Sequence, residues 1–217
     1  MWHTLPQVAV CHNVGMDEPP HGGGPTESLR ERKKTQTREA LFAAGMRLFA
    51  ARGFAAVTVA EIAAEADVAP RTFHRYFPDK VELLFAGDDD LRETMITALD
   101  QTAVDADPLV VIRAVLAAVA KRLGGQHIEL VIRERLISET PALRDRDLAK
   151  RAGLEALVAE RLAVRFGVTV DDLQAQWWAG VAFATFAAGY RAWLKQGGDL
   201  GAHLESALEL LEHGVPS

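Results

Sequence analysis

The stretch VAPRTFHRYFPDK, residues 68–80, holds the signals that decide the fold. Phe73 and Phe77 stand four positions apart, so they share one face of a helix. At about 100° per residue, Arg71 and Arg75 lie on the face opposite Phe73. A segment this short that turns two arginines toward water while burying its aromatic side chains indicates a binding surface.

The residues around this stretch predict two further short helices. An apolar helical pattern runs from Thr35 to Gly53, a residue suited to a left-handed helix cap. Thr58 is followed three positions later by Glu61, the pattern of a capping box at the start of a second helix. Pro70 stands at an allowed early position of the third helix. Three short helices with a tight turn between the last two have the proportions of a helix-turn-helix unit.

The rest of the chain predicts an all-α protein of about nine helices. Pro78 begins a fourth helix, and periodic apolar runs follow, separated by Pro or Gly, over residues 108–123, 126–139, 141–166, 171–196 and 200–213. Residues 1–28 are expected to form a disordered arm, because their polar, Pro- and Gly-rich composition cannot bury enough apolar surface. A three-helix helix-turn-helix head is expected over residues 29–85, and a second helical domain over residues 86–217.

Charge is distributed unevenly along the chain. The net charge is −6, which argues against a general polyanion binder. Residues 29–81, however, hold ten Lys and Arg against six Asp and Glu, and the remainder is strongly acidic. This asymmetry indicates an end that faces nucleic acid on an otherwise acidic body.

Several classes of site are not expected. A single cysteine, Cys11, excludes an intrachain disulfide and a cysteine-based metal cluster within one chain. His127, His203 and His213 lack the spacing of a metal-ligand set, so neither a metal nor a cofactor is expected. The motifs of nucleophile elbows, phosphate loops and dinucleotide-binding turns are missing, which argues against an enzyme. We expect a cytoplasmic protein, since no basic segment precedes an apolar run near residue 1.

Residues 173–190 carry no charged side chain, a length near the lower limit of a membrane span. Two glutamines and many small residues favour a buried helix at a subunit interface over a membrane helix. No membrane partner is therefore expected.

The run from Thr35 to Phe85 resembles the DNA-binding domain of the TetR family of bacterial repressors. The matching features are a first helix ending in ARGF, the segment VTVAEIAAEADV, and a recognition helix ending in RYF with a lysine three residues beyond that phenylalanine. The resemblance implies a homodimeric transcriptional regulator, most often a repressor, that a small lipophilic effector releases from a pseudo-palindromic operator. Residues 86–217 would then bind the effector and form the dimer. The RTFHRYF form is similar to an actinobacterial subgroup, some members of which sense lipophilic or acyl-thioester ligands.

The same resemblance implies DNA contacts for particular residues. The recognition helix would run from about Pro70 to Phe77, and its early residues would face base edges or adjacent phosphates, with Arg71 suited to pair with a guanine. These early residues are Pro70, Arg71, Thr72 and His74. The candidates for phosphate contacts are Thr58, Arg75, Tyr76 and Lys80.

Three points remain open in this head. Ala60 stands where some family members place a base-reading arginine, so specificity is expected to depend mainly on Arg71 and His74. His74 has an alternative role in packing, since a histidine beside an aromatic residue often serves only that purpose. The basic run of Arg30, Arg32, Lys33, Lys34 and Arg38 is either a solvated charge run or a flexible arm that contacts phosphates or the minor groove.

The aromatic residues of the helix over 171–196 also allow two interpretations. They belong to the core and the dimer contact, or they line an apolar cavity between helices, the usual effector site in this architecture. An arginine beside such a cavity would suit an anionic, lipophilic ligand. The candidates for the lining are Met95, Leu99, Arg133, Trp178, Phe183 and Phe186.

A different class of protein remains as the alternative. A helical carrier of small molecules with a non-functional head would bind a ligand but no DNA. The sequence does not separate a repressor from an activator, because that depends on where the operator lies.

Overall fold

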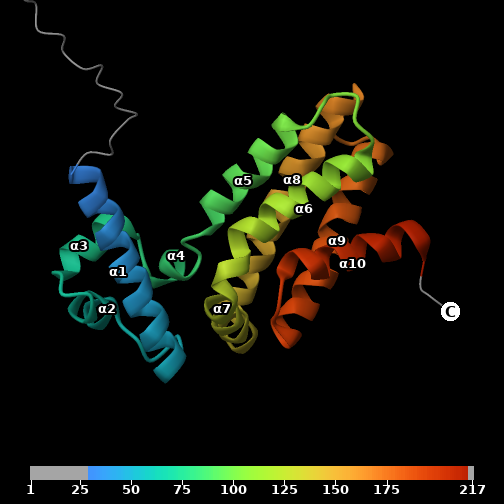
Figure 1. Cartoon of the computed structure of the whole chain (residues 1–217). Coiled ribbons are helices and arrows are strands. Elements are labelled where there is room, and N and C mark those ends of the chain that lie inside the picture. Colours follow the sequence, from blue (N-terminus) through green and yellow to red (C-terminus); the bar gives the residue numbers. More distant parts are fainter. Residues whose placement is uncertain (1–28, 215–217) are drawn as a thin grey trace, which may run out of the picture.

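Residues 29–214 are described by the structure, a computed structural model, and all their regular secondary structure is helical. The expected disordered arm over residues 1–28 lies outside the described residues. Four helices form the head: α1 (Leu29–Arg52), α2 (Val59–Glu65), α3 (Pro70–Tyr76) and α4 (Lys80–Leu84). The body holds α5 (Asp88–Gln101), α6 (Pro108–Leu123), a 3-10 turn (Gly124–Gln126), α7 (His127–Glu139), α8 (Pro141–Phe166), α9 (Leu173–Gln196) and α10 (Leu200–His213). Figure 1 shows the head beside the body, with α4 leading from one to the other.

The predicted all-helical fold with an N-terminal helix-turn-helix head is confirmed. The described residues hold ten α-helices, and the one not foreseen as a separate run is α5. The first helix begins at Leu29, earlier than the expected Thr35, so most of the basic run lies on its first turns. In residues 29–214, no helix has both the length and the apolar character needed to cross a membrane.

The ends of the head helices follow the local signals of the sequence. The first helix ends at Arg52, and Gly53 adopts a φ of +78°, the left-handed conformation that glycine reaches without strain. Thr58 and Glu61 form the complete capping box at the start of α2. Pro70 opens α3 as predicted. Together these caps fix the tight geometry of the three-helix unit.

The start of α4 differs from the prediction. This helix begins at Lys80 instead of Pro78, because the Asp79 side chain caps it by accepting a hydrogen bond from the Glu82 backbone N–H at 2.9 Å. The shift places Lys80 at the first helical position.

The hydrophobic core consists of two clusters. One joins α1 to α4 around Phe49 and Phe73, and it also includes Leu136 and Ile137 of α7 and Leu143 of α8. The other lies among the body helices and surrounds the large apolar side chains of α6, α8, α9 and α10. The body therefore supplies part of the core of the head. This shared core attaches the head to the body.

Helices α9 and α10 pack closely against each other at Gly189. A Cβ atom at this position would lie 2.8 Å from the backbone oxygen of His203 and 2.8 Å from a methyl carbon of Leu204. No side chain fits at that distance from backbone, so the close contact depends on glycine.

We expect Gly189→Ala to lower the free energy of unfolding by about 1–3 kcal/mol, because the added methyl overpacks the α9–α10 contact. Gly153→Ala is the matched control, since nothing lies within 4 Å of a Cβ placed at this exposed position of α8. It should raise stability by up to about 1 kcal/mol through helix propensity alone. Chemical denaturation of both variants measures the difference, and equal effects at the two positions would contradict the proposed packing constraint.

Candidate functional site

Helix α3 separates its side chains as the sequence predicted. Phe73 is fully buried and Phe77 is nearly so, and both belong to the core of the head. Arg71, His74 and Arg75 are exposed on the other side of the helix. The buried aromatic pair thus fixes the orientation of a polar face that points into solvent.

The remaining polar groups of α3 have local partners. Arg75 lies 5.0 Å from the centre of the Tyr76 ring and donates a hydrogen bond to its hydroxyl at 3.1 Å. The Nδ1 atom of His74 lies 3.1 Å from the backbone oxygen of Pro78, and its ring packs edge-on against that of Phe73. Pro70 is exposed at the start of the helix, and Thr72 is half-buried.

Thr58 is exposed, but its hydroxyl is engaged with Glu61. The hydroxyl accepts a hydrogen bond from the Glu61 backbone at 3.3 Å and donates one to the Glu61 carboxylate at 2.8 Å. The pKa of Glu61 falls to about 2, first because the Thr58 backbone N–H donates to it, then through the Thr58 hydroxyl and Arg52. Thr58 therefore acts as the cap of α2 in this structure, and a phosphate contact would share its hydroxyl.

Lys80 and Arg38, both expected to contact DNA, have partners inside the protein in this structure. The Nζ atom of Lys80 donates to the backbone oxygens of Phe54 and Val57, both at 2.8 Å, and lies 4.5 Å from the centre of the Phe54 ring. Arg38 donates to the backbone oxygen of Ala86 and borders the body cavity. Both cations are thus directed into the protein, and neither is presented to a phosphate in this conformation.

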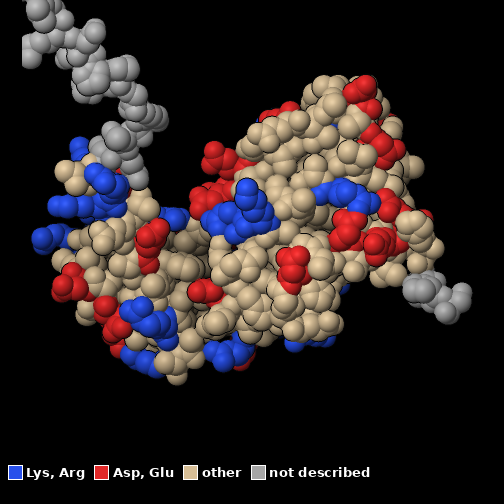
Figure 2. Space-filling model, in the orientation of Figure 1, with Lys and Arg blue, Asp and Glu red and all other residues tan. Residues whose placement is uncertain are grey.

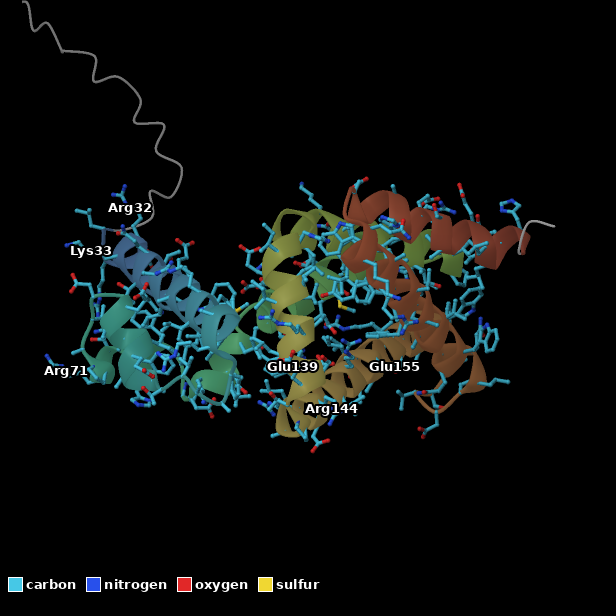
Figure 3. The ribbon with its side chains drawn as sticks, turned by 90° about the horizontal axis from the view of Figure 1, so that it is seen from below. Arg32, Lys33, Arg71, Glu139, Arg144 and Glu155 are labelled. Atoms are coloured by element: carbon cyan, nitrogen blue, oxygen red, sulfur yellow. The ribbon has the colours of Figure 1, made fainter. Side chains whose placement is uncertain are left out.

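A basic surface continues from α3 to the start of α1. The first turns of α1 carry the exposed residues Arg30, Arg32, Lys33 and Lys34. Figure 2 shows blue side chains gathered at this end of the head, whereas red ones are spread over the body. In Figure 3, Arg32, Lys33 and Arg71 project from the same outer side of the head. The part of the basic run that begins α1 thus extends the polar face of α3.

A half-open cavity of about 730 Å³ lies among the body helices. Apolar side chains of α5, α6, α8 and α9 form most of its wall, and the cavity also touches Phe42 and Met46 of α1. Five of the residues expected to line a cavity do so, namely Met95, Leu99, Arg133, Phe183 and Phe186. Trp178 is not among the lining residues, because it packs half-buried against the body core.

Two cations connect the cavity to the end of α4. Arg133 lies 4.7 Å and Lys150 lies 4.9 Å from the centre of the Phe85 ring, whose side chain is buried. Asp88 pairs with both of them, at 3.2 Å from Arg133 and 3.4 Å from Lys150. Lys150 also lies 3.5 Å from Glu82 of α4. The last turn of the head is therefore held by side chains from α7 and α8 that also line the cavity.

A second polar group also lines the cavity wall. Arg151 pairs with Asp147 at 2.6 Å and with Glu134 at 3.2 Å. Burial raises the pKa of Glu134, although the charge of Arg151 acts in the opposite direction. Burial also raises the pKa of Tyr190.

Most of these polar cavity residues were not foreseen from the sequence. Asp147 and Arg151 carry a weak signal, since they stand four positions apart on a predicted helix. Tyr190 ends a charge-free run, and its only signal in the sequence is that it is aromatic. Asp88, Glu134 and Lys150 have no local pattern, because their partners are distant in sequence. Within residues 29–214, no three His, Cys, Asp or Glu side chains lie together as a metal site.

A basic helix-turn-helix face on a helical body with an apolar cavity defines a DNA-binding transcription regulator with a ligand-binding domain. Residues 41–86 match the family model of bacterial regulatory proteins of the tetR family, and residues 106–216 match that of the MftR C-terminal domain. The chain belongs to the TetR family of bacterial transcription regulators, which are not enzymes.

Individual relatives agree with this membership. The chain is 32% identical to the HTH-type transcriptional regulator TcmR of Streptomyces glaucescens over 162 residues, which is 70% of this chain and 69% of TcmR. It is similar to FadR of Thermus thermophilus, a TetR-family repressor solved with lauroyl-CoA, at 28% identity and a TM-score of 0.51, over 83% of this chain and 95% of that one. The fold also matches FadR of Bacillus subtilis, solved with stearoyl-CoA, at 23% identity and a TM-score of 0.60, over 82% and 99% of the two chains.

We expect Lys80→Met to lower the free energy of unfolding by about 1–3 kcal/mol, because the backbone oxygens of Phe54 and Val57 lose their donor. Lys34→Met is the control, a charge-matched change at an exposed position of α1. Thermal and chemical denaturation measure both. If Lys80→Met left stability unchanged but weakened DNA binding, the phosphate contact expected from the sequence would be the correct role.

Proposed function

We propose that the protein is a homodimeric repressor of the cytoplasm, and that a small lipophilic effector entering the body cavity releases it from a pseudo-palindromic operator. One observation carries this proposal: the cavity borders both the body helices and the head, through Phe42 and Met46 of α1. A ligand there would contact the element that orients the DNA-binding face. Ligand binding in the cavity and the position of the head would therefore depend on each other.

The comparisons support a lipophilic effector. FadR of Thermus thermophilus was solved with lauroyl-CoA, and this chain is 28% identical to it across most of both chains. The cavity wall suits such a ligand, because it consists largely of aliphatic and aromatic side chains, among them Leu99, Phe183 and Phe186.

The DNA-binding domain would comprise residues 29–85, and the effector and dimerisation domain residues 86–217. Arg71 and His74 would read base edges, while Arg75 and Tyr76 would contact the backbone, helped by Pro70 and Thr72 at the start of the helix. Two copies of α3 would enter successive major grooves about 34–36 Å apart. The exposed basic turns of α1 lie on the same side as Arg71 and would add phosphate contacts.

A second copy of the chain would cover apolar surface on α8 and α9. Val164 is 82% exposed, Leu173 80% and Trp177 61%, which is unusual for large apolar side chains on these two helices. Burying them between subunits would fix the separation of the two heads, which a palindromic site requires.

Release would pass through the end of α4. The Phe85 ring contacts Arg133 and Lys150, and both of these side chains line the cavity. An effector that binds the released state more tightly than the DNA-bound state would shift the equilibrium by the ratio of the two affinities. By the same linkage, DNA would lower the affinity of the protein for the effector by the same factor by which the effector lowers its affinity for DNA.

The alternative is a helical carrier whose head no longer binds DNA. The inward direction of Arg38 and Lys80 favours the carrier. These two side chains were expected to contact phosphates, but they donate hydrogen bonds to backbone oxygens of the protein. The exposed Arg71 favours the repressor, since no described residue forms a hydrogen bond or an ion pair with its guanidinium.

We expect Arg71→Ala to weaken operator binding by about 1–3 kcal/mol and to relax base preference. The matched control is Arg92→Ala, which removes the same charge from an exposed position of α5. Fluorescence anisotropy with DNA from upstream of the protein's own gene, repeated at several salt concentrations, measures both. If neither the wild type nor the control bound any DNA at low salt while a ligand bound the cavity, the carrier would replace the repressor.

We expect Phe85→Leu to reduce the response to effector, because leucine keeps the apolar contact but loses the attraction to Arg133 and Lys150. The measurement is the ratio of operator Kd values with and without saturating lauroyl-CoA, which should fall toward one. Phe166→Leu is the control, since Phe166 ends α8 and packs only against the body core. An unchanged ratio in Phe85→Leu would exclude this contact from the release mechanism.

A further inference from the structure

We infer that the effector presents an uncharged hydrogen-bond acceptor, such as an ester, ketone or amide carbonyl, to Arg133 in the wall of the cavity. The inference rests on the proposed function and adds the chemical class of the polar group that the cavity takes. It also departs from the anionic ligand that the sequence suggested for Arg133.

Arg133 carries a donor that finds no hydrogen-bond partner within residues 29–214. Its side chain is 18% exposed, and its Nε atom is buried without a hydrogen bond. The outer nitrogen of the same guanidinium pairs with Asp88 at 3.2 Å and Asp147 at 3.6 Å. A buried donor without a partner is unfavourable. The Nε atom has almost no accessible surface in this structure, so the guanidinium would turn to meet a ligand oxygen and would then gain a hydrogen bond that the free protein leaves unmade.

The charge of Arg133 is already compensated. Each of the cations in this part of the wall has two carboxylate partners, at 3.2 and 3.6 Å for Arg133, 3.5 and 3.4 Å for Lys150, and 2.6 and 3.2 Å for Arg151. Over the whole wall, five Lys and Arg side chains face seven Asp and Glu side chains. A ligand carboxylate would therefore add negative charge to a wall that already has an excess of it.

The neighbouring residues also disfavour a further anion. Burial raises the pKa of Glu134, the residue next to Arg133, even though Arg151 lies beside it. Burial that opposes the ionisation of the Glu134 carboxyl would also oppose the ionisation of a carboxyl group on a ligand bound beside it. A neutral acceptor avoids this cost and still satisfies the Arg133 donor.

The rest of the ligand would be apolar. Phe183 and Phe186 of α9 and Met95 and Leu99 of α5 line the same cavity, and Phe186 stacks on Tyr190 with ring centres 5.1 Å apart. A linear or compact hydrocarbon body with one uncharged carbonyl at its polar end matches this distribution.

The test compares two probes that share a chain and differ in charge, methyl dodecanoate and dodecanoate. Their binding to the full chain is measured at pH 7.5 by intrinsic tryptophan fluorescence and by equilibrium dialysis. We expect the ester to bind more tightly than the anion by on the order of tenfold or more. The comparison needs no variant, so a folding defect cannot obscure it.

Arg133→Lys then tests the residue itself. Lysine retains a charge for Asp88 and Asp147 but lacks the Nε donor, so ester affinity should fall by roughly fivefold to tenfold. Arg92→Lys is the control, because Arg92 is an exposed residue of α5 that does not line the cavity. It should bind the ester like the wild type.

The outcomes separate this inference from the proposed function. Equal or tighter binding of dodecanoate would overturn the inference and leave a repressor with an anionic effector. Equal losses in Arg133→Lys and Arg92→Lys would also overturn it. If neither probe bound, the inference and the lipophilic effector would both be wrong, while operator binding by the unliganded protein would still test the regulator.

Discussion

The aromatic ring of Phe85 joins the head of this protein to its body. The side chain is 2% exposed and stands at the end of α4, with Arg133 of α7 and Lys150 of α8 both within about 5 Å of its ring centre. A cation near an aromatic face gains from the ring quadrupole, and the gain is larger where water is excluded. The same two cations hold Asp88 at the start of α5. One ring thus fixes the direction in which the chain passes from the DNA-binding unit into the ligand-binding domain.

The sequence predicted those parts of the fold that depend on local chemistry. The capping box of Thr58 and Glu61, the left-handed Gly53 and the early Pro70 each involve neighbours within a few residues. The apolar spacing of Phe73 and Phe77 likewise fixes which face of α3 is buried. Such features follow from residue type and spacing alone, so the head could be predicted closely.

Features that depend on distant partners could not be predicted in the same way. Lys80 binds the backbone oxygen of Phe54, 26 positions earlier, and Arg38 binds that of Ala86, 48 positions later. Neither acceptor carries any signal in sequence, because every residue has a backbone oxygen. The same holds for the cavity: Arg133 was chosen correctly as a lining residue, but its neutralisation by Asp88 and Asp147 appears only when α5, α7 and α8 are packed together.

The two kinds of contact between head and body differ in how readily they change. Leu136, Ile137 and Leu143 complete the core of the head, and close-packed apolar contacts of this kind tolerate little displacement. The ion pairs around Asp88 and Glu82 behave differently, because Lys150 already shares its charge between two carboxylates at nearly equal distances. Partners of similar energy can be exchanged at small cost, especially where a ligand supplies or removes one hydrogen bond. In the proposed release mechanism we therefore expect the apolar contacts to keep their packing as the head moves, and the polar contacts beside the cavity to be the part of the junction that a ligand rearranges.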